Sequence, residues 1–132
     1  MRIEHKGNAT SSTLDAGTSA GDLTITAVSL TNWPDGSVGE FYGAIEKGRA
    51  TEEKIRFSGR TGNTLSVAAR GVDDTTAQSH PINASIEHIW TAVEADEANI
   101  HVNTVHTSLY YQTSAPSAVT VGVLWVDSNS EA

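Results

Sequence analysis

The chain has 132 residues, the length of one domain, and its 16 acidic against 8 basic side chains give a formal net charge of −8. This balance argues against nucleic acid and anionic membrane as partners, because phosphate groups are bound by basic surfaces. The absence of cysteine excludes disulfides, a thiol nucleophile and a cysteine zinc site. The apolar runs are a few residues long, too short to cross a bilayer, so we expect no membrane partner.

The N-terminal part of the chain shows no periodic pattern. Residues 7–22 are small and polar, and their few apolar positions repeat at neither 2 nor 3.6 residues. We therefore predict an extended arm over residues 1–22 that packs on a neighbouring subunit or a capsid protein rather than on its own domain. A disordered N-terminus is the alternative.

Alternating apolar and polar residues between turn signals predict five strands. They lie at 23–29, 40–47, 53–58, 63–69 and 85–90. The fold class expected is mainly β, a small antiparallel β-sandwich or barrel-like domain over residues 23–109, with one short helix and extended N- and C-terminal segments. The three middle strands are joined by short turns, which favours an antiparallel meander. The predicted buried set is Leu23, Ile25, Ile45, Ile55, Phe57, Leu65, Val67, Ile86 and Trp90.

One helix is predicted at about 91–106, where Thr91 and Glu94 have the spacing of a capping box. An apolar stripe with spacings of 3 and 4 residues follows, and residues 110–132 then form an extended segment with one strand. We predict that the stripe and nearby aromatic side chains form an oligomer interface. Its members are Ala95, Ala98, Val102, Val105, Leu109, Tyr110, Tyr111 and Trp125. The alternative is that the stripe covers the chain's own sheet.

Four histidines in the second half, His80, His88, His101 and His106, raise the question of a metal site. The last two are five residues apart and fall on different helical faces, and no metal-binding motif surrounds any of them. We expect surface or capping histidines with local hydrogen bonds. A three-fold axis that gathers copies of His101 or His106 is the one route to a metal site.

Other combinations of reactive residues also favour structural readings. The Asp73-Asp74 pair lacks the remaining ligands of a calcium loop, so a turn is expected. The Ser79-His80 pair, with Asp73 close in sequence, lacks the surroundings of a catalytic triad. Acidic pairs such as Glu52-Glu53 are expected to be solvated. The sequence therefore predicts no catalytic, cofactor-binding or metal-binding residue, no cofactor and no enzymatic activity.

Two parts of the chain resemble sequence motifs found in β-rich modules of tailed-bacteriophage virion proteins, of the tail-fibre, minor tail and head-decoration type. The matching residues include the run Gly62–Val67, Arg70-Gly71-Val72-Asp73, Thr75-Thr76-Ala77, His80, the Ile86–His88 strand, Glu97-Ala98-Asn99, His101-Val102-Asn103, Thr113–Ser117 and Val121–Asp127. The chain departs from the family pattern at Asp74, where glycine is expected, at Pro81 after His80, and at Val123, which replaces an acid. The resemblance implies a structural role and, because such appendages are commonly three-fold, a homotrimer.

The expected function is therefore that of a non-enzymatic phage virion protein, located on the head surface or the tail. It would act as a capsid decoration or cement subunit, or as a small tail-fibre or baseplate adaptor, with itself and other virion proteins as partners. The alternative is a carbohydrate-binding β module or a small hydrolase, which would require an exposed Trp33 or Trp90 beside paired acids.

Overall fold

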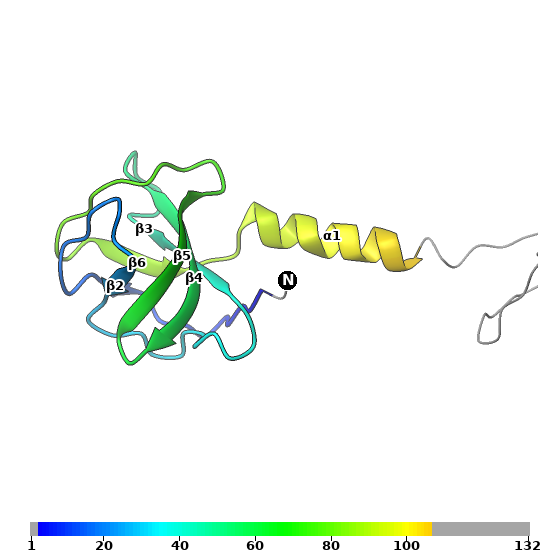
Figure 1. Cartoon of the computed structure of the whole chain (residues 1–132), viewed down its shortest axis with the longest axis horizontal. Coiled ribbons are helices and arrows are strands. Elements are labelled where there is room, and N and C mark those ends of the chain that lie inside the picture. Colours follow the sequence, from blue (N-terminus) through cyan, green and yellow to red (C-terminus); the bar gives the residue numbers. More distant parts are fainter. Residues whose placement is uncertain (1–2, 107–132) are drawn as a thin grey trace, which may run out of the picture. The chain divides into compact units, whose positions relative to one another are not determined.

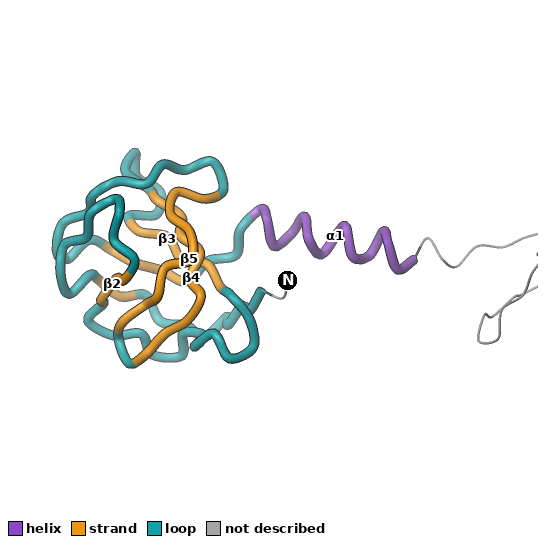
Figure 2. The backbone as a smooth tube through the Cα atoms, viewed as in Figure 1, coloured by secondary structure: helices purple, strands orange, loops and turns teal. Residues whose placement is uncertain are grey.

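The computed structural model describes residues 3–106, with side chains for residues 3–100. The fold is mainly β, as predicted, with long loops between the strands and one helix (Figures 1 and 2). The chain divides after Ala95, so the β domain and the rest of the helix are described separately.

The β domain is one antiparallel six-stranded sheet. Its strands are β1 (Ser12–Thr13), β2 (Thr24–Thr26), β3 (Phe41–Ile45), β4 (Glu53–Thr61), β5 (Thr64–Val72) and β6 (Ser85–His88), in the spatial order β1-β6-β3-β4-β5-β2. All five predicted strands are present, and β3, β4 and β5 form the predicted meander. The two-residue turn between β4 and β5 contains Gly62, whose φ of 59° is a conformation that glycine adopts without steric cost. Strand β1 was not predicted.

The sheet curls until its two edge strands meet, which gives the barrel-like form of the prediction. Leu14, directly after β1, forms a bridge with Ala27, directly after β2. The backbone N–H of Asp15 donates to the carbonyl of Thr26 at 3.0 Å, and the N–H of Val28 donates to the carbonyl of Thr13 at 2.9 Å. Register shifts between β4 and β5 help to bend the sheet, because bulges increase local twist and curvature.

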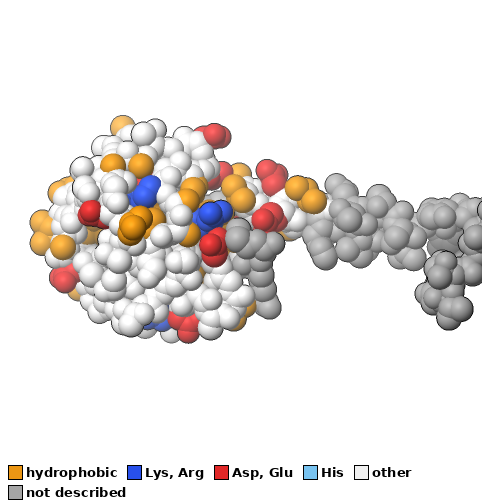
Figure 3. All heavy atoms as spheres, in the orientation of Figure 1, with side chains coloured by type: hydrophobic (Ala, Val, Ile, Leu, Met, Phe, Trp, Pro, Cys, Tyr) orange, Lys and Arg blue, Asp and Glu red, His pale blue; other side chains and the backbone are white. Residues whose placement is uncertain are grey.

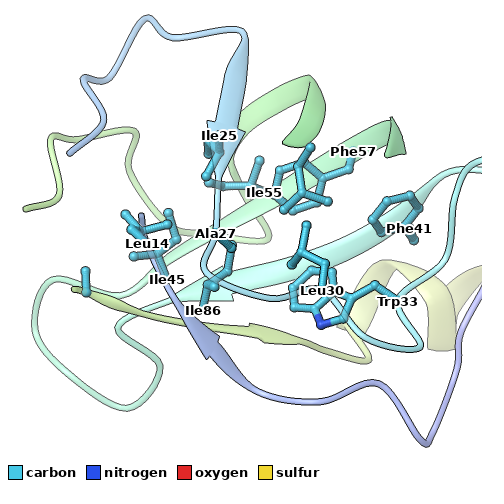
Figure 4. Close-up of a cluster of buried hydrophobic side chains, with 12 residues drawn as sticks. Leu14, Ile25, Ala27, Leu30, Trp33, Phe41, Ile45, Ile55, Phe57 and Ile86 are labelled. Atoms are coloured by element: carbon cyan, nitrogen blue, oxygen red, sulfur yellow. The ribbon is translucent and has the colours of Figure 1, made fainter. Parts of the chain in front are cut away.

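The main core fills the inside of this curl, and its side chains point toward one another (Figure 4). Six predicted members are confirmed as buried, and Val67 is partly buried against them; the six are Ile25, Ile45, Ile55, Phe57, Leu65 and Ile86. Two predictions are wrong, since Leu23 is 74% exposed and Trp90 is 58% exposed. Leu23 precedes the first residue of β2 and Trp90 follows the last residue of β6, so the alternation that predicted them stops before it reaches them.

The prediction of an N-terminal arm that avoids its own domain is wrong for residues 3–22. Strand β1 pairs with β6, Leu14 is fully buried in the main core, and Thr18 forms a bridge with His80. The segment is held chiefly by backbone pairing at the sheet edge, together with one large apolar side chain. Neither feature produces a repeating pattern, and so the sequence pattern did not reveal them.

A second, smaller cluster lies on the outward side of β3. Tyr42, Ala44 and Ile89 are buried there, with Ile3 and Val72 packed against them. Tyr42 and Ala44 are outward because Phe41 and Ile45 belong to the main core. The start of the described chain and the residues after β6 therefore meet at the same place on the β domain.

Helix α1 spans Ala92–His106, close to the predicted 91–106. The capping box is confirmed: the Thr91 N–H donates to Glu94 Oε2 at 2.6 Å, and the Glu94 N–H donates to Thr91 Oγ1 at 3.4 Å. The Glu94 carboxylate also lies in the first turn, where its negative charge is attracted to the positive end of the helix dipole. Within residues 3–106 no helix has the length and apolar character needed to cross a membrane.

Candidate functional site

The densest group of ionisable side chains in the described chain joins Glu46, Glu53, Arg70 and His80, which we call the Glu53 cluster. Arg70 donates two parallel hydrogen bonds to Glu53, from Nε to Oε1 at 2.6 Å and from an η nitrogen to Oε2 at 2.8 Å. His80 lies between two carboxylates, with Nε2 2.9 Å from Glu53 Oε2 and Nδ1 3.1 Å from Glu46 Oε2. The side chains of Glu53 and His80 are completely buried.

The alternation of β4 places Glu53 in this position. It shares the inward face of the strand with Ile55 and Phe57, which are in the main core. Arg70 comes from the neighbouring strand β5, and His80 comes from the loop before β6. The expectation that Glu53 is solvated is therefore wrong.

The cluster also connects two loops to the end of β5. Arg70 donates to the carbonyls of Ser19 at 2.7 Å and Gln78 at 2.9 Å. The backbone N–H groups of Gly71 and Gln78 each donate to Glu53 at 3.2 Å. The N-terminal segment, the end of β5 and the loop before β6 are thus tied to one buried carboxylate.

The cluster places two carboxylates, those of Glu46 and Glu53, against the guanidinium of Arg70 and the two ring nitrogens of His80. Burial opposes the charge of Glu53, but hydrogen bonds from Arg70, His80 and Gln78 outweigh it and hold its pKa below the usual value. Hydrogen bonds from Thr51 and His80 likewise lower the pKa of Glu46.

This geometry suits a structural role better than catalysis. Glu53 accepts five hydrogen bonds, whereas a carboxylate has about four lone-pair sites, so no oxygen is left for a substrate or a metal. His80 contacts Glu46 and Glu53 rather than Asp73, so the catalytic triad considered for Ser79-His80 is not assembled. The expectation of surface histidines with local bonds is wrong for His80, whose partners lie 27 and 34 residues away in the sequence.

Acid should destabilise the β domain through these carboxylates. A carboxyl group whose folded pKa is lowered contributes stability that is complete above its unfolded pKa, near 4.5, and is lost as the pH falls through the folded value. We expect the urea midpoint to fall as the pH is lowered below 4.5. A midpoint that stays level as the pH is lowered below 4.5 would contradict the lowered pKa values of the two carboxylates.

The loop after β5 begins with a turn at Asp73-Asp74, as predicted. Asp73 pairs with Lys54, with Oδ2 2.6 Å from Nζ, and Thr75 Oγ1 donates to the carbonyl of Val72 at 2.8 Å. Gly71 has a φ of 60°, and a Cβ there would lie 2.5 Å from the N of Ala77. Among the described residues, no three His, Asp or Glu side chains gather as metal ligands would. The side chains of His101 and His106, considered for a site on a symmetry axis, lie outside the described ones.

The two tryptophans considered for a carbohydrate platform have opposite environments. Trp33 is fully buried in the main core and donates its Nε1–H to the carbonyl of Thr10 at 2.7 Å, so it has no face for a sugar. Trp90 is 58% exposed and meets the His5 ring edge to face, with the centroids 5.4 Å apart. Of the two tryptophans considered for this role, only Trp90 has an exposed ring.

The predicted interface residues are only partly described. Ala95 is half-buried and Ala98 is exposed. Val102 and Val105 lie in α1, and their spacing from Ala95 and Ala98 puts all four on one side of the helix. Four members fall outside the described residues; these are Leu109, Tyr110, Tyr111 and Trp125. The interface therefore stays a prediction.

Ile100 is one of the apolar residues of the helix that were not singled out from the sequence. Ile100 is 64% exposed and lies off the stripe, because it is two residues from both Ala98 and Val102.

On the face of the β domain shown in Figure 3, hydrophobic and charged side chains are scattered over a surface that is mostly neither. Comparisons of the sequence with models of protein families and with curated proteins found no match.

Proposed function

We propose that this chain is a non-enzymatic structural protein of a tailed-bacteriophage virion. It assembles as a homotrimer and serves as a capsid decoration or cement subunit, or as a small tail-fibre or baseplate adaptor. The resemblance of residues 61–103 and 113–127 to virion modules supports this proposal.

The observation that supports a structural role best is the use made of the ionisable residues. The buried cluster with the chemistry of a catalytic site, Glu46, Glu53, Arg70 and His80, is satisfied by internal bonds and ties loops together. The polar groups of the small β domain bind its own loops, and the helix that follows has exposed apolar residues. This combination fits a rigid domain that assembles with other chains through its helix.

The helix supplies the contact in this proposal. A helix of 15 residues is marginal in water without packing, and the stripe at Ala95, Ala98, Val102 and Val105 offers an apolar side for that packing. Three copies of the stripe, completed by Leu109 and by aromatic residues of the following segment, would form the three-fold seam.

The oligomeric state of two helix variants tests the seam. We expect light scattering to give the mass of a trimer for the wild-type chain and of a monomer for Val102→Asp, since a buried charge in a shared seam is costly. Ile100→Asp places the same charge off the stripe and should stay trimeric. A monomeric wild-type chain at high concentration, or a trimer broken by Ile100→Asp and not by Val102→Asp, would contradict the seam.

The virion location is tested separately. In an electron-microscopy map of the intact particle, the β domain should be found on the head surface or the tail, with a three-fold contact through residues 95–109. A particle that lacks the chain altogether would overturn the proposed function, whatever the oligomeric state in solution.

A further inference from the structure

The first residues of the described chain are fastened to His88, the last residue of β6. The Lys6 N–H donates to His88 Nε2 at 3.0 Å, and His88 Nδ1 is 2.7 Å from the carbonyl oxygen of Tyr42. A carbonyl only accepts, so Nδ1 carries the proton, and Nε2 must keep its lone pair for Lys6. The structure therefore needs one neutral tautomer of His88.

The remaining contacts of this segment, residues 3–6, define an N-terminal strap. Ile3 forms a parallel bridge with Glu40, and the Glu4 N–H donates to the Glu40 carbonyl at 2.7 Å. His5 stacks on His88, with centroids 4.6 Å apart and ring planes inclined by 26°. The strap thus depends on the His88 ring for one hydrogen bond and one stacking contact.

We propose that protonation of His88 releases the strap from the β domain, so that residues 3–6 act as an acid-operated latch. A proton on Nε2 removes the acceptor for Lys6 and sets two N–H groups against each other. It also places a positive charge on a ring that His5 covers. Release uncovers the end of the main core next to His88 and removes Ile3 from the outer cluster.

The charged groups around the ring all oppose its protonation or are engaged elsewhere. On the strap, Lys6 and His5 are basic, and Glu4 lies 3.5 Å from Lys6 Nζ. The other rings nearby carry no charge. The ring centroid of His88 lies 5.6 Å from that of Trp33 and 6.1 Å from that of Phe41, and Trp90 contacts His5. On β6 itself, Glu87 is paired with Lys47 at 3.3 Å and faces the other side of the strand.

The range of pH over which the latch opens follows from this environment. Burial, together with the positive charges of His5 and Lys6, lowers the pKa of His88 from 6.5 to about 4, although the Tyr42 carbonyl raises it. Because the pKa of His88 is lower in the closed state than in the open state, protons bind more readily to the open state. The closed state therefore becomes less favourable as the pH falls from the open-state pKa toward the closed-state pKa. The ratio of closed to open strap should fall about 20-fold from pH 7 to pH 5 and about 100-fold by pH 4.

Amide hydrogen exchange of the full chain tests the latch. After correction for intrinsic rates, protection of the Glu4 and Lys6 amides should fall about 20-fold between pH 7 and pH 5. Amides of β4 should keep their protection over the same interval, because the carboxylates of Glu46 and Glu53, whose pKa values are lowered from 4.5, stay ionised there. Strap protection that is constant, or that falls together with that of β4, would overturn the proposal.

Two variants identify the group that responds. His88→Phe keeps an aromatic ring but takes no proton, so strap protection should be low and independent of pH between 7 and 5. His5→Phe keeps the stacking contact and should retain the pH response. The reverse pattern, with the response lost in His5→Phe, would contradict the assignment to His88.

A spectroscopic measurement on the wild-type chain keeps the proposal testable if His88→Phe does not fold. The ring nitrogen shifts of His88 should show a proton on Nδ1 alone at pH 7 and on both nitrogens in acid. This change should coincide with the loss of strap protection. A His88 ring that becomes charged while the strap stays protected would refute the latch.

Discussion

Replacing Arg70 with methionine should lower the free energy of unfolding by about 3–5 kcal/mol, the usual effect of removing one partner of a buried ion pair. Methionine fills much of the same space but leaves Glu53 ionised and buried without its two strongest hydrogen bonds. It also leaves the carbonyls of Ser19 and Gln78 without a donor from Arg70. Urea unfolding followed by far-ultraviolet circular dichroism measures the loss.

Arg56→Met is the matched control. Arg56 also pairs with a glutamate, Glu40, at 3.1 Å, but its side chain is 33% exposed against 8% for Arg70, so the same substitution should cost less there. Adding Glu53→Leu to Arg70→Met should recover part of the loss, because the unpaired charge disappears. A loss of no more than about 1 kcal/mol in Arg70→Met, the value of an exposed ion pair, would show that the Glu53 cluster does not stabilise the fold.

Leu14→Ala should cost about 2–5 kcal/mol, the range for truncating a buried leucine, because Leu14 is fully buried among the main core residues. Leu23→Ala makes the same change at a side chain that is 74% exposed, and the loss there should be within about 0.5 kcal/mol. The thermal midpoints of the two variants, measured side by side, give the comparison.

This pair distinguishes a domain that includes its N-terminal residues from one that carries them as an arm. An arm predicts that Leu14→Ala is neutral and that the domain folds without residues 2–20. The structure predicts the opposite for both, since deleting those residues removes β1 and the Thr18 bridge to His80. Retention of a cooperative transition in the deletion variant would contradict the structure.

The parts of the fold that were predictable are those in which a local pattern repeats. Ile55 and Phe57 alternate with Lys54 and Arg56, and the structure puts the first two in the core and the others on the outer face. The capping box was predictable because its two residues are three positions apart, and each side chain accepts a hydrogen bond from the backbone N–H of the other residue.

The buried cluster was missed although its signal was present. Glu53 is two residues before Ile55, so the alternation that predicted Ile55 and Phe57 as inward also places Glu53 inward. An acidic residue indicates an exposed position only when the fold supplies no buried partner for its charge. Those partners, Arg70 and His80, are 17 and 27 residues away, and no local pattern connects them to Glu53.

The closure of the sheet has a consequence for how the chain folds. Strand β1 pairs with β6, so Ser12 must find Ile86 across nearly the whole domain before the two edges are sealed. Such distant pairing costs loop entropy before it gains contacts, and proteins dominated by it fold in milliseconds to seconds. On a ribosome that adds about 5–20 residues each second, the first strand emerges several seconds before its partner. Leu14 is then among the earliest core residues made and among the last to be covered, and chaperones have that interval in which to bind it.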